Sequence, residues 1–408
     1  MKIYSSALLI ALFTGVFIST AFRAEAAEVY YLGGSGQGSG AQANPSYSLK
    51  QRFSDLLDLS KDNKERSGRI SGSLSEQFIR NDVSGNTSKS FLRRGNVYVS
   101  EANLNLMEKL GGNYHLESQV FLRQTDDLRI DPRKDVRMKQ FNLKIMNPDN
   151  LYEFGDFYGD LSQFTLSSSL EGAHAVVTPS PSQKYQVVAA RVGEADQAAG
   201  KFQRNVGALK ADHYFFMDSK MFSNFRMGLQ AVTVADDSST VERTASTQDI
   251  NNTVLSTDGE IALRGPLSLQ YELASSFYKD ETASDPHHTD KANAFRLAPA
   301  LNFSNWSTRY LYYLVQPKFY TDQGSASPDK EQHQLSVDYR FSKRLSVNVM
   351  ENYYWDHLPG SSRTMRTTNN EQYVTITGQP FEERPSFVLR PYVSYARKDS
   401  DDLGNTAG

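Results

Sequence analysis

The sequence predicts an all-β fold, and within that class a transmembrane antiparallel up-and-down β-barrel of about 16–18 strands. Three observations predict it. Apolar and polar residues alternate over long stretches, and short turns alternate with long polar links along the chain. In addition, no segment after the first residues holds the roughly 18 uninterrupted apolar residues of a membrane-spanning helix.

The alternation is clearest in LSLQYELASSF, residues 267–277. In an extended strand, successive side chains point to opposite faces, so one face is mainly Leu, Tyr and Phe and the other includes Gln270 and Glu272. Eleven residues at about 3.3 Å each span about 36 Å, enough to cross an apolar band of about 25 Å when tilted near 45°. Strands of soluble sheets also alternate but are usually about 5–6 residues long.

The same period of two recurs from about Ser67 onward. It is present in residues 96–106, 114–123, 225–234, 334–341, 345–355 and 387–396. Counting all such stretches gives about 17 strands. We expect lipid to contact the apolar faces and water inside the barrel to contact the polar faces.

The links between these stretches alternate in length. Tight links rich in turn residues occur at 110–113, 147–150, 264–266, 303–305 and 341–344, and long polar links lie between them. Short turns at one end of the strands and long loops at the other are typical of outer-membrane barrels. The last predicted strand runs toward the long-loop end. A closed barrel usually has an even number of strands, so we expect the sequence to be a fragment of a longer protein, unless one strand is missed.

The first residues predict export. Residues 1–26 have the pattern of a signal peptide, with Lys2, an apolar core over 7–18 and a small-residue cleavage motif at 24–26. Residues 27–66 are predicted to be a periplasmic linker containing a short amphipathic helix at 49–57, and residues 67–408 the barrel.

Composition excludes several functions. The chain has no cysteine, so thiolate metal sites are absent. Its net charge of −3 argues against a nucleic-acid partner. Asp285, His287, His288 and Asp290 lie together only in a polar loop, and no serine has the context of a nucleophile. We therefore predict no cofactor, no metal site, no catalytic residue and no enzyme activity.

Together, the signal peptide, the long amphipathic strands and the alternating turns and loops resemble those of porin-type Gram-negative outer-membrane β-barrel proteins. The resemblance implies location in the outer membrane and contact with the lipid bilayer and lipopolysaccharide. It also implies small hydrophilic solutes as ligands, and a homo-oligomer is compatible with it. Aromatic residues near strand ends are expected to form interfacial girdles. These are Phe277, Tyr98, Trp306, Tyr310, Tyr353 and Trp355.

Charged residues of the polar faces are the candidate lumen-lining groups. They are Arg226, Arg264, Arg296, Arg309, Arg340, Arg390, Asp258, Glu260, Glu272 and Asp338. Both signs are present, so no strong ion preference follows. The segment 154–172, FGDFYGDLSQFTLSSSLEG, is less polar than the other links and is predicted to be a structured connection or an inward-folded loop.

The function predicted from these features is a porin-like channel for passive or selective diffusion of small hydrophilic solutes. The alternative is a non-enzymatic outer-membrane barrel for assembly, export or sheathing that binds a partner protein. A barrel enzyme and a secreted soluble β-protein are further readings, and the latter would not depend on detergent.

Overall fold

A computed structural model defines the fold. It describes residues 68–84, 90, 92–128, 131, 135–193, 195–196, 201–216, 219–242, 249–281, 288–384 and 386–402. The predicted signal peptide, linker and amphipathic helix lie outside these residues. No helix in the described ranges is long and apolar enough to cross a membrane.

The described chain contains 17 strands, which confirms the predicted all-β class and strand number. The first nine are β1 (Arg69–Asn81), β2 (Gly95–Lys109), β3 (His115–Thr125), β4 (Arg137–Met146), β5 (Asn150–Ser162), β6 (Leu166–Ser180), β7 (Gln183–Val192), β8 (Gln203–Tyr214) and β9 (Phe222–Asp237). The others are β10 (Asp249–Leu263), β11 (Leu267–Glu281), β12 (His288–Asn302), β13 (Trp306–Val315), β14 (Lys330–Ser342), β15 (Leu345–Asp356), β16 (Met365–Gly378) and β17 (Tyr392–Asp402).

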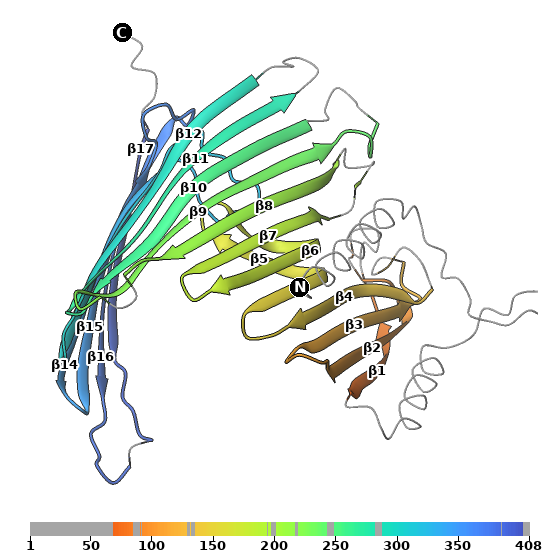
Figure 1. The fold of residues 1–408 in the computed structure, drawn as a ribbon, viewed down its shortest axis with the longest axis horizontal. Coiled ribbons are helices and arrows are strands. Elements are labelled where there is room, and N and C mark those ends of the chain that lie inside the picture. Colours follow the sequence, from red (N-terminus) through yellow and green to blue (C-terminus); the bar gives the residue numbers. More distant parts are fainter. Residues whose placement is uncertain are drawn as a thin grey trace, which may run out of the picture. The chain divides into compact units, whose positions relative to one another are not determined.

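Each strand pairs antiparallel with the next one along the chain, so the sheet is an up-and-down meander (Figure 1). Among the described residues, β1 and β17 do not pair with each other. Each of these two strands therefore has one unpaired edge.

The two faces of the strands differ as the alternation predicts. On β11, Leu273 and Phe277 are 45% and 41% exposed, whereas Glu272 and Ser276 on the opposite face are 4% and 0% exposed. We call the face with the exposed large apolar side chains the outward face and the other the inner face. The outward face continues through Leu209 on β8 and Leu255 on β10.

The last strand differs from the prediction. Residues 387–396 were expected to form it, but β17 begins only at Tyr392. Pro391 has no N–H to donate to a strand ladder, and its carbonyl oxygen accepts a hydrogen bond from Ile376 N at 3.0 Å. Arg390 consequently lies before the strand. The link 379–391 is also longer than the other turns at its end of the sheet.

A hairpin leaves the sheet at a pair of glycines. β5 pairs with β4 only up to Gly155, and β6 pairs with β7 only from Glu171 onward, so the segment between pairs only with itself. Gly155 and Gly172 lie opposite each other in the hairpin. Gly155 has a φ of +92°, and a Cβ at either glycine would clash with a carbonyl oxygen of the neighbouring strand. We call residues 156–170 the inner hairpin. A structured connection or an inward-folded loop was predicted at 154–172, whereas the structure forms the ends of two paired strands there, folded over the inner face.

The inner hairpin packs into a dry interior. Its Phe157, Leu161, Leu166 and Leu170 form an apolar cluster with valines and alanines on β7–β9. Phe164 at its tip belongs to a second cluster with Phe319 and with small residues of β10–β13. The alternation of side chains predicts water along the inner faces, whereas this part of the interior buries inward Val206, Val232, Val234 and Val254.

Candidate functional site

Two segments far apart in the sequence meet over the inner face. They are the tip of the inner hairpin and the link 316–329 between β13 and β14. Ser167 N donates to Gln323 O at 2.7 Å, and Ser325 N donates to Gln163 O at 2.9 Å. Ser168 Oγ also donates to Gln323 Oε1 at 2.8 Å. We call this junction, residues 162–168 with 321–325, the clasp.

The link side of the clasp is anchored to the inner face around Tyr320. Asn252 Nδ2 of β10 donates to Tyr320 O at 2.9 Å, and Tyr320 N donates to Ser276 Oγ of β11 at 3.2 Å. The Tyr320 ring stacks on Tyr278 at 4.0 Å between centroids. Two hydrogen bonds between strand side chains and the link backbone, together with a ring stack, thus fix the link against two strands.

The hairpin side is anchored by polar side chains of the strands. Lys210 Nζ donates to Leu161 O at 2.7 Å, and Phe164 N donates to Glu272 Oε1 at 3.3 Å. Thr165 Oγ1 donates to Gln230 Oε1 at 3.1 Å. Because these groups come from β8, β9 and β11, the tip is held against at least three strands of the inner face.

A polar pocket of about 490 Å³ lies beside the hairpin tip. Its charged lining residues are Asp160, Lys184, Lys210, Asp212, Arg226, Asp258, Glu260, Glu272 and Arg296. With five carboxylates and four cations, the lining has no strong excess of either sign. We call this cavity the charged pocket and take it, with the clasp, as the candidate functional site.

An ion-pair network crosses the charged pocket. Arg226 contacts Asp212 at 2.5 Å and Asp258 at 2.6 Å, so one guanidinium bridges β8 and β10. Lys210 Nζ lies 3.2 Å from Asp258 Oδ1, and Gln230 Nε2 donates to the same oxygen at 3.2 Å. Buried charges need such partners because desolvation alone would make them costly.

Other charges of the pocket are not engaged in this way. Lys184 and Arg296 make no ion pair within 4.0 Å among the described residues, and neither do Asp160 and Glu260. These four groups leave both signs available to a solute.

The structure gathers half of the predicted lumen-lining residues. Arg226, Arg296, Asp258, Glu260 and Glu272 all line the charged pocket. Sequence reasoning missed Lys184, Lys210, Asp212 and Asp160. The missed signal was alternation on β8, where Ala208, Lys210 and Asp212 share the inner face.

The remaining predicted residues lie elsewhere. Arg264 is in the turn after β10, and its Nε donates to the carbonyl oxygen of Ser219 at 2.8 Å. Arg309 on β13 and Arg340 and Asp338 on β14 are exposed and alternate with outward tyrosines. Arg390 is exposed in the segment before β17.

Two carboxylates outside the strands have perturbed pKa values. Burial raises the pKa of Asp322 in the clasp, although the Arg204 guanidinium 3.4 Å away opposes the shift. Burial also acts to raise the pKa of Asp131. Hydrogen bonds and charges from Lys139 and Arg137 outweigh it and hold that pKa below its ordinary value.

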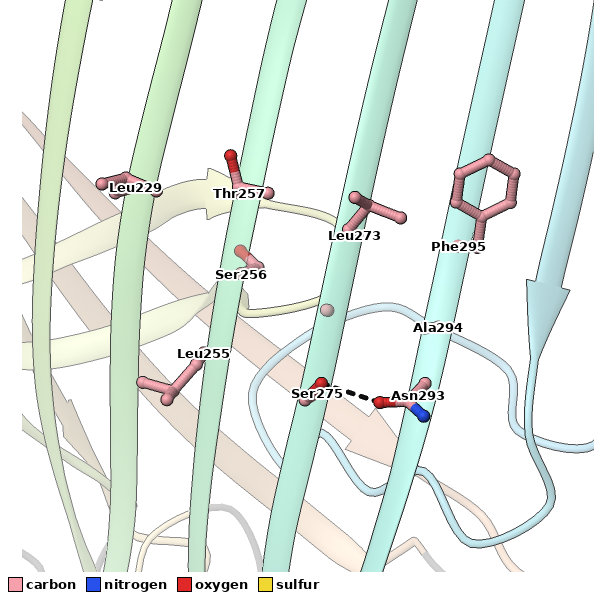
Figure 2. Close-up of a pocket in the computed structure, with 10 residues that line it drawn as sticks. Leu229, Leu255, Ser256, Thr257, Leu273, Ser275, Asn293, Ala294 and Phe295 are labelled. Carbon is pink, nitrogen blue, oxygen red and sulfur yellow. Dashed lines mark hydrogen bonds between the residues drawn. The ribbon is translucent and has the colours of Figure 1, made fainter.

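A second hollow lies on the outward face and has a different chemistry. It measures about 570 Å³, and Figure 2 shows Leu229, Leu255, Leu273 and Phe295 projecting around it. Its polar feature is a hydrogen bond of 2.7 Å from Ser275 Oγ to Asn293 Oδ1. No charged side chain of the described residues lines it. Within the described ranges, no group of three or more His, Cys, Asp or Glu could hold a metal ion.

The fold and the site define an all-β up-and-down protein with an apolar outward face and segments folded against a charged interior. No family model matches the chain. No curated protein matches it.

Solved structures similar to this chain include three bacterial proteins. A BenF-like porin from Pseudomonas fluorescens Pf-5 has a TM-score of 0.42 and 11% identity, covering 82% of this chain and 94% of that one. Acinetobacter baumannii OccAB3 has a TM-score of 0.40 and 12% identity, covering 82% of this chain and 94% of that one. Pseudomonas aeruginosa OccK2 (OpdF), solved in complex with glucuronate, has a TM-score of 0.42 and 9% identity, covering 83% of this chain and 94% of that one.

Proposed function

We propose that this chain is a porin-like outer-membrane channel for passive or selective diffusion of small hydrophilic solutes, without enzyme activity. The observation that carries the proposal is the opposition of the two faces on the same strands. The outward face exposes large apolar side chains, and the inner face holds the clasp and the charged pocket.

The outward face supports a place in a bilayer. Leu209 and Leu229 are 58% and 57% exposed, and they belong to a continuous apolar surface over neighbouring strands. Contiguous exposed apolar surface of this kind is rare on soluble monomers. In hydrocarbon, the antiparallel ladders satisfy the backbone polar groups within the sheet. The unpaired edges of β1 and β17 would also have to be closed there.

Aromatic residues mark both ends of the outward face. Trp306 begins β13 at the short-turn end and stacks on Phe303 at 4.6 Å. Trp355 is near the long-loop end of β15, with Tyr353 at 5.4 Å. Tryptophan and tyrosine prefer the two membrane interfaces, so these pairs fit the girdles expected from the sequence. The partners would be the bilayer, lipopolysaccharide and, if the outward faces of two copies meet, a homo-oligomer.

The clasp and the charged pocket would set the selectivity. A solute passing them would exchange water for hydrogen bonds to the pocket, where both free cations and free carboxylates are present. We expect weak ion preference, because both signs of charge line the pocket. We also expect the clasp to set the size limit for solutes, because its two segments lie across the inner face.

One observation favours the alternative, a barrel that assembles with or sheathes a partner protein. The unpaired edges of β1 and β17 among the described residues could each accept an extended partner strand. Such a protein would capture its partner without passing current.

Planar-bilayer recording of the refolded full chain tests the proposal. We expect stepwise, steady conductance, together with swelling of proteoliposomes in small sugars and amino acids. Electrically silent bilayers, from protein that shows the heat-modifiable gel migration of a folded barrel, would contradict the channel and leave the alternative standing.

A further inference from the structure

The inner face of β14–β16 differs from the rest of the interior because it is lined by side-chain amides. Gln332 and Gln334 project from β14 to this face, and Asn348 and Asn352 project from β15. All four are half-buried, and no apolar cluster covers them among the described residues. We call this surface the amide face.

The amides form a cross-strand ladder. Gln332 Nε2 donates to Asn352 Oδ1 at 2.7 Å, and Asn352 Nδ2 donates to Glu371 Oε2 of β16 at 3.1 Å. Asn348 Nδ2 donates to Asp338 Oδ1 at 2.8 Å. One oxygen of each carboxylate thereby accepts a hydrogen bond from an amide, so the ladder links β14, β15 and β16.

The ladder leaves part of each amide unused. The carbonyl oxygens of Gln332, Gln334 and Asn348 accept no hydrogen bond from the described residues, and Gln332 and Gln334 each have a second N–H. Both N–H groups of Asn348 are used, because its Nδ2 also donates to Ser336 Oγ at 3.4 Å. Inward side chains that follow each other on an antiparallel strand are about 6.8 Å apart. The face therefore presents paired donors and acceptors at regular intervals along the interior.

Tyrosine rings lie beside these amides. Tyr354 of β15 is next to Gln332, and Lys330 Nζ lies over its ring, 4.4 Å from the ring centroid. Tyr373 of β16 lies opposite Met350, and its ring has no aromatic or cationic neighbour in the described strands. A half-exposed ring beside amides offers an apolar surface and hydrogen bonds to one ligand.

We propose that the amide face binds neutral polyhydroxylated solutes, that is, saccharides. Each sugar hydroxyl both donates and accepts, as does each amide, and the C–H face of a sugar ring can stack on Tyr373. The inference rests on the proposed channel function, since a solute reaches this face through the interior.

Titration calorimetry of the refolded full chain with maltotriose tests the inference. The detergent must have a zwitterionic head group, because alkyl glycosides would compete. We expect saturable binding that Gln334→Leu and Tyr373→Ala each weaken by about fivefold, the loss expected for one hydrogen bond or stacking contact. The matched controls Gln372→Leu and Tyr395→Ala remove the same residue types from the outward face and should change affinity less than twofold.

Parallel planar-bilayer recording separates the two proposals. Conductance without any binding or current block by maltotriose would overturn the saccharide site and leave the channel intact. Equal losses in the inner and outward variants would also overturn it. Maltotriose binding by a protein that passes no current would support the site and contradict the channel.

Discussion

The clasp should control conductance through Phe164. This side chain is fully buried, and it packs against Tyr313 at 5.6 Å and Phe319 at 5.9 Å. Truncating a buried phenylalanine to alanine typically costs about 3–5 kcal/mol. If most of that loss falls on the closed state of the clasp, the ratio of open to closed clasp rises by roughly a hundredfold to a thousandfold.

Single-channel recording of Phe164→Ala measures this. We expect larger mean conductance, more current noise and a larger solute cut-off in liposome swelling than in the wild type. The control Phe277→Ala removes the same ring from the outward face of the neighbouring β11, where it is 41% exposed, and should leave conductance unchanged. A Phe164→Ala channel with wild-type conductance and cut-off would refute the role of the clasp.

Three further predictions concern stability and selectivity. Because the folded state raises the pKa of Asp322 above 3.8, its stabilising contribution is present at low pH and lost as pH rises through the folded value. Asp322→Asn should therefore reduce the fall in melting temperature that the wild type shows as pH rises from about 3.8 through the folded pKa of Asp322. A variant with the same pH profile as the wild type would contradict this contribution of Asp322. Arg226→Met removes the bridge of two carboxylates, so reversal potentials should shift toward cations and stability should fall by about 3–5 kcal/mol, whereas Arg264→Met in the turn should do neither. Gly155→Ala should destabilise the fold by more than about 1–2 kcal/mol, from positive φ plus a backbone clash, and Gly207→Ala, with open space around it, should not; equal melting temperatures of the two variants would contradict the need for glycine where the inner hairpin leaves the sheet.

Local patterns in the sequence were sufficient to predict most of the strands, but not the ends of β5 and β6 or the start of β17. Alternation of side chains and turn chemistry are both local, so residues 345–355 cover β15 almost to its end, and residues 267–277 start where β11 starts, although β11 continues to Glu281. The alternation of short and long links was also predicted, with two exceptions in the structure. The link between β5 and β6 is a tight hairpin tip, and the link 379–391 is long.

The clasp could not be predicted, because its two halves are more than 150 residues apart in the chain, as the bond from Ser168 to Gln323 illustrates. No periodic pattern records such a contact. The composition of 154–172 did mark the segment as unusual, but which strands it would contact depends on the register of the whole sheet.

The dry interior was missed for a different reason. Period-two reasoning assigns water to the face opposite the apolar one, yet Val232 and Val234 on the inner face of β9 are buried under the inner hairpin. Apolar residues on both faces signal a strand covered on both sides. Five of the ten charged residues proposed for the interior still converge on one pocket, since period two does fix their face.

Site-directed cysteine labelling along β11 tests the central claim most directly, and the natural chain contributes no background thiol. Fluorophores at Leu273→Cys and Gln270→Cys would be compared in proteoliposomes with a spin-labelled lipid and with a water-soluble quencher. We predict lipid quenching at 273 and aqueous quenching at 270, alternating along the strand. Aqueous quenching at both positions would contradict the placement of the outward face in lipid.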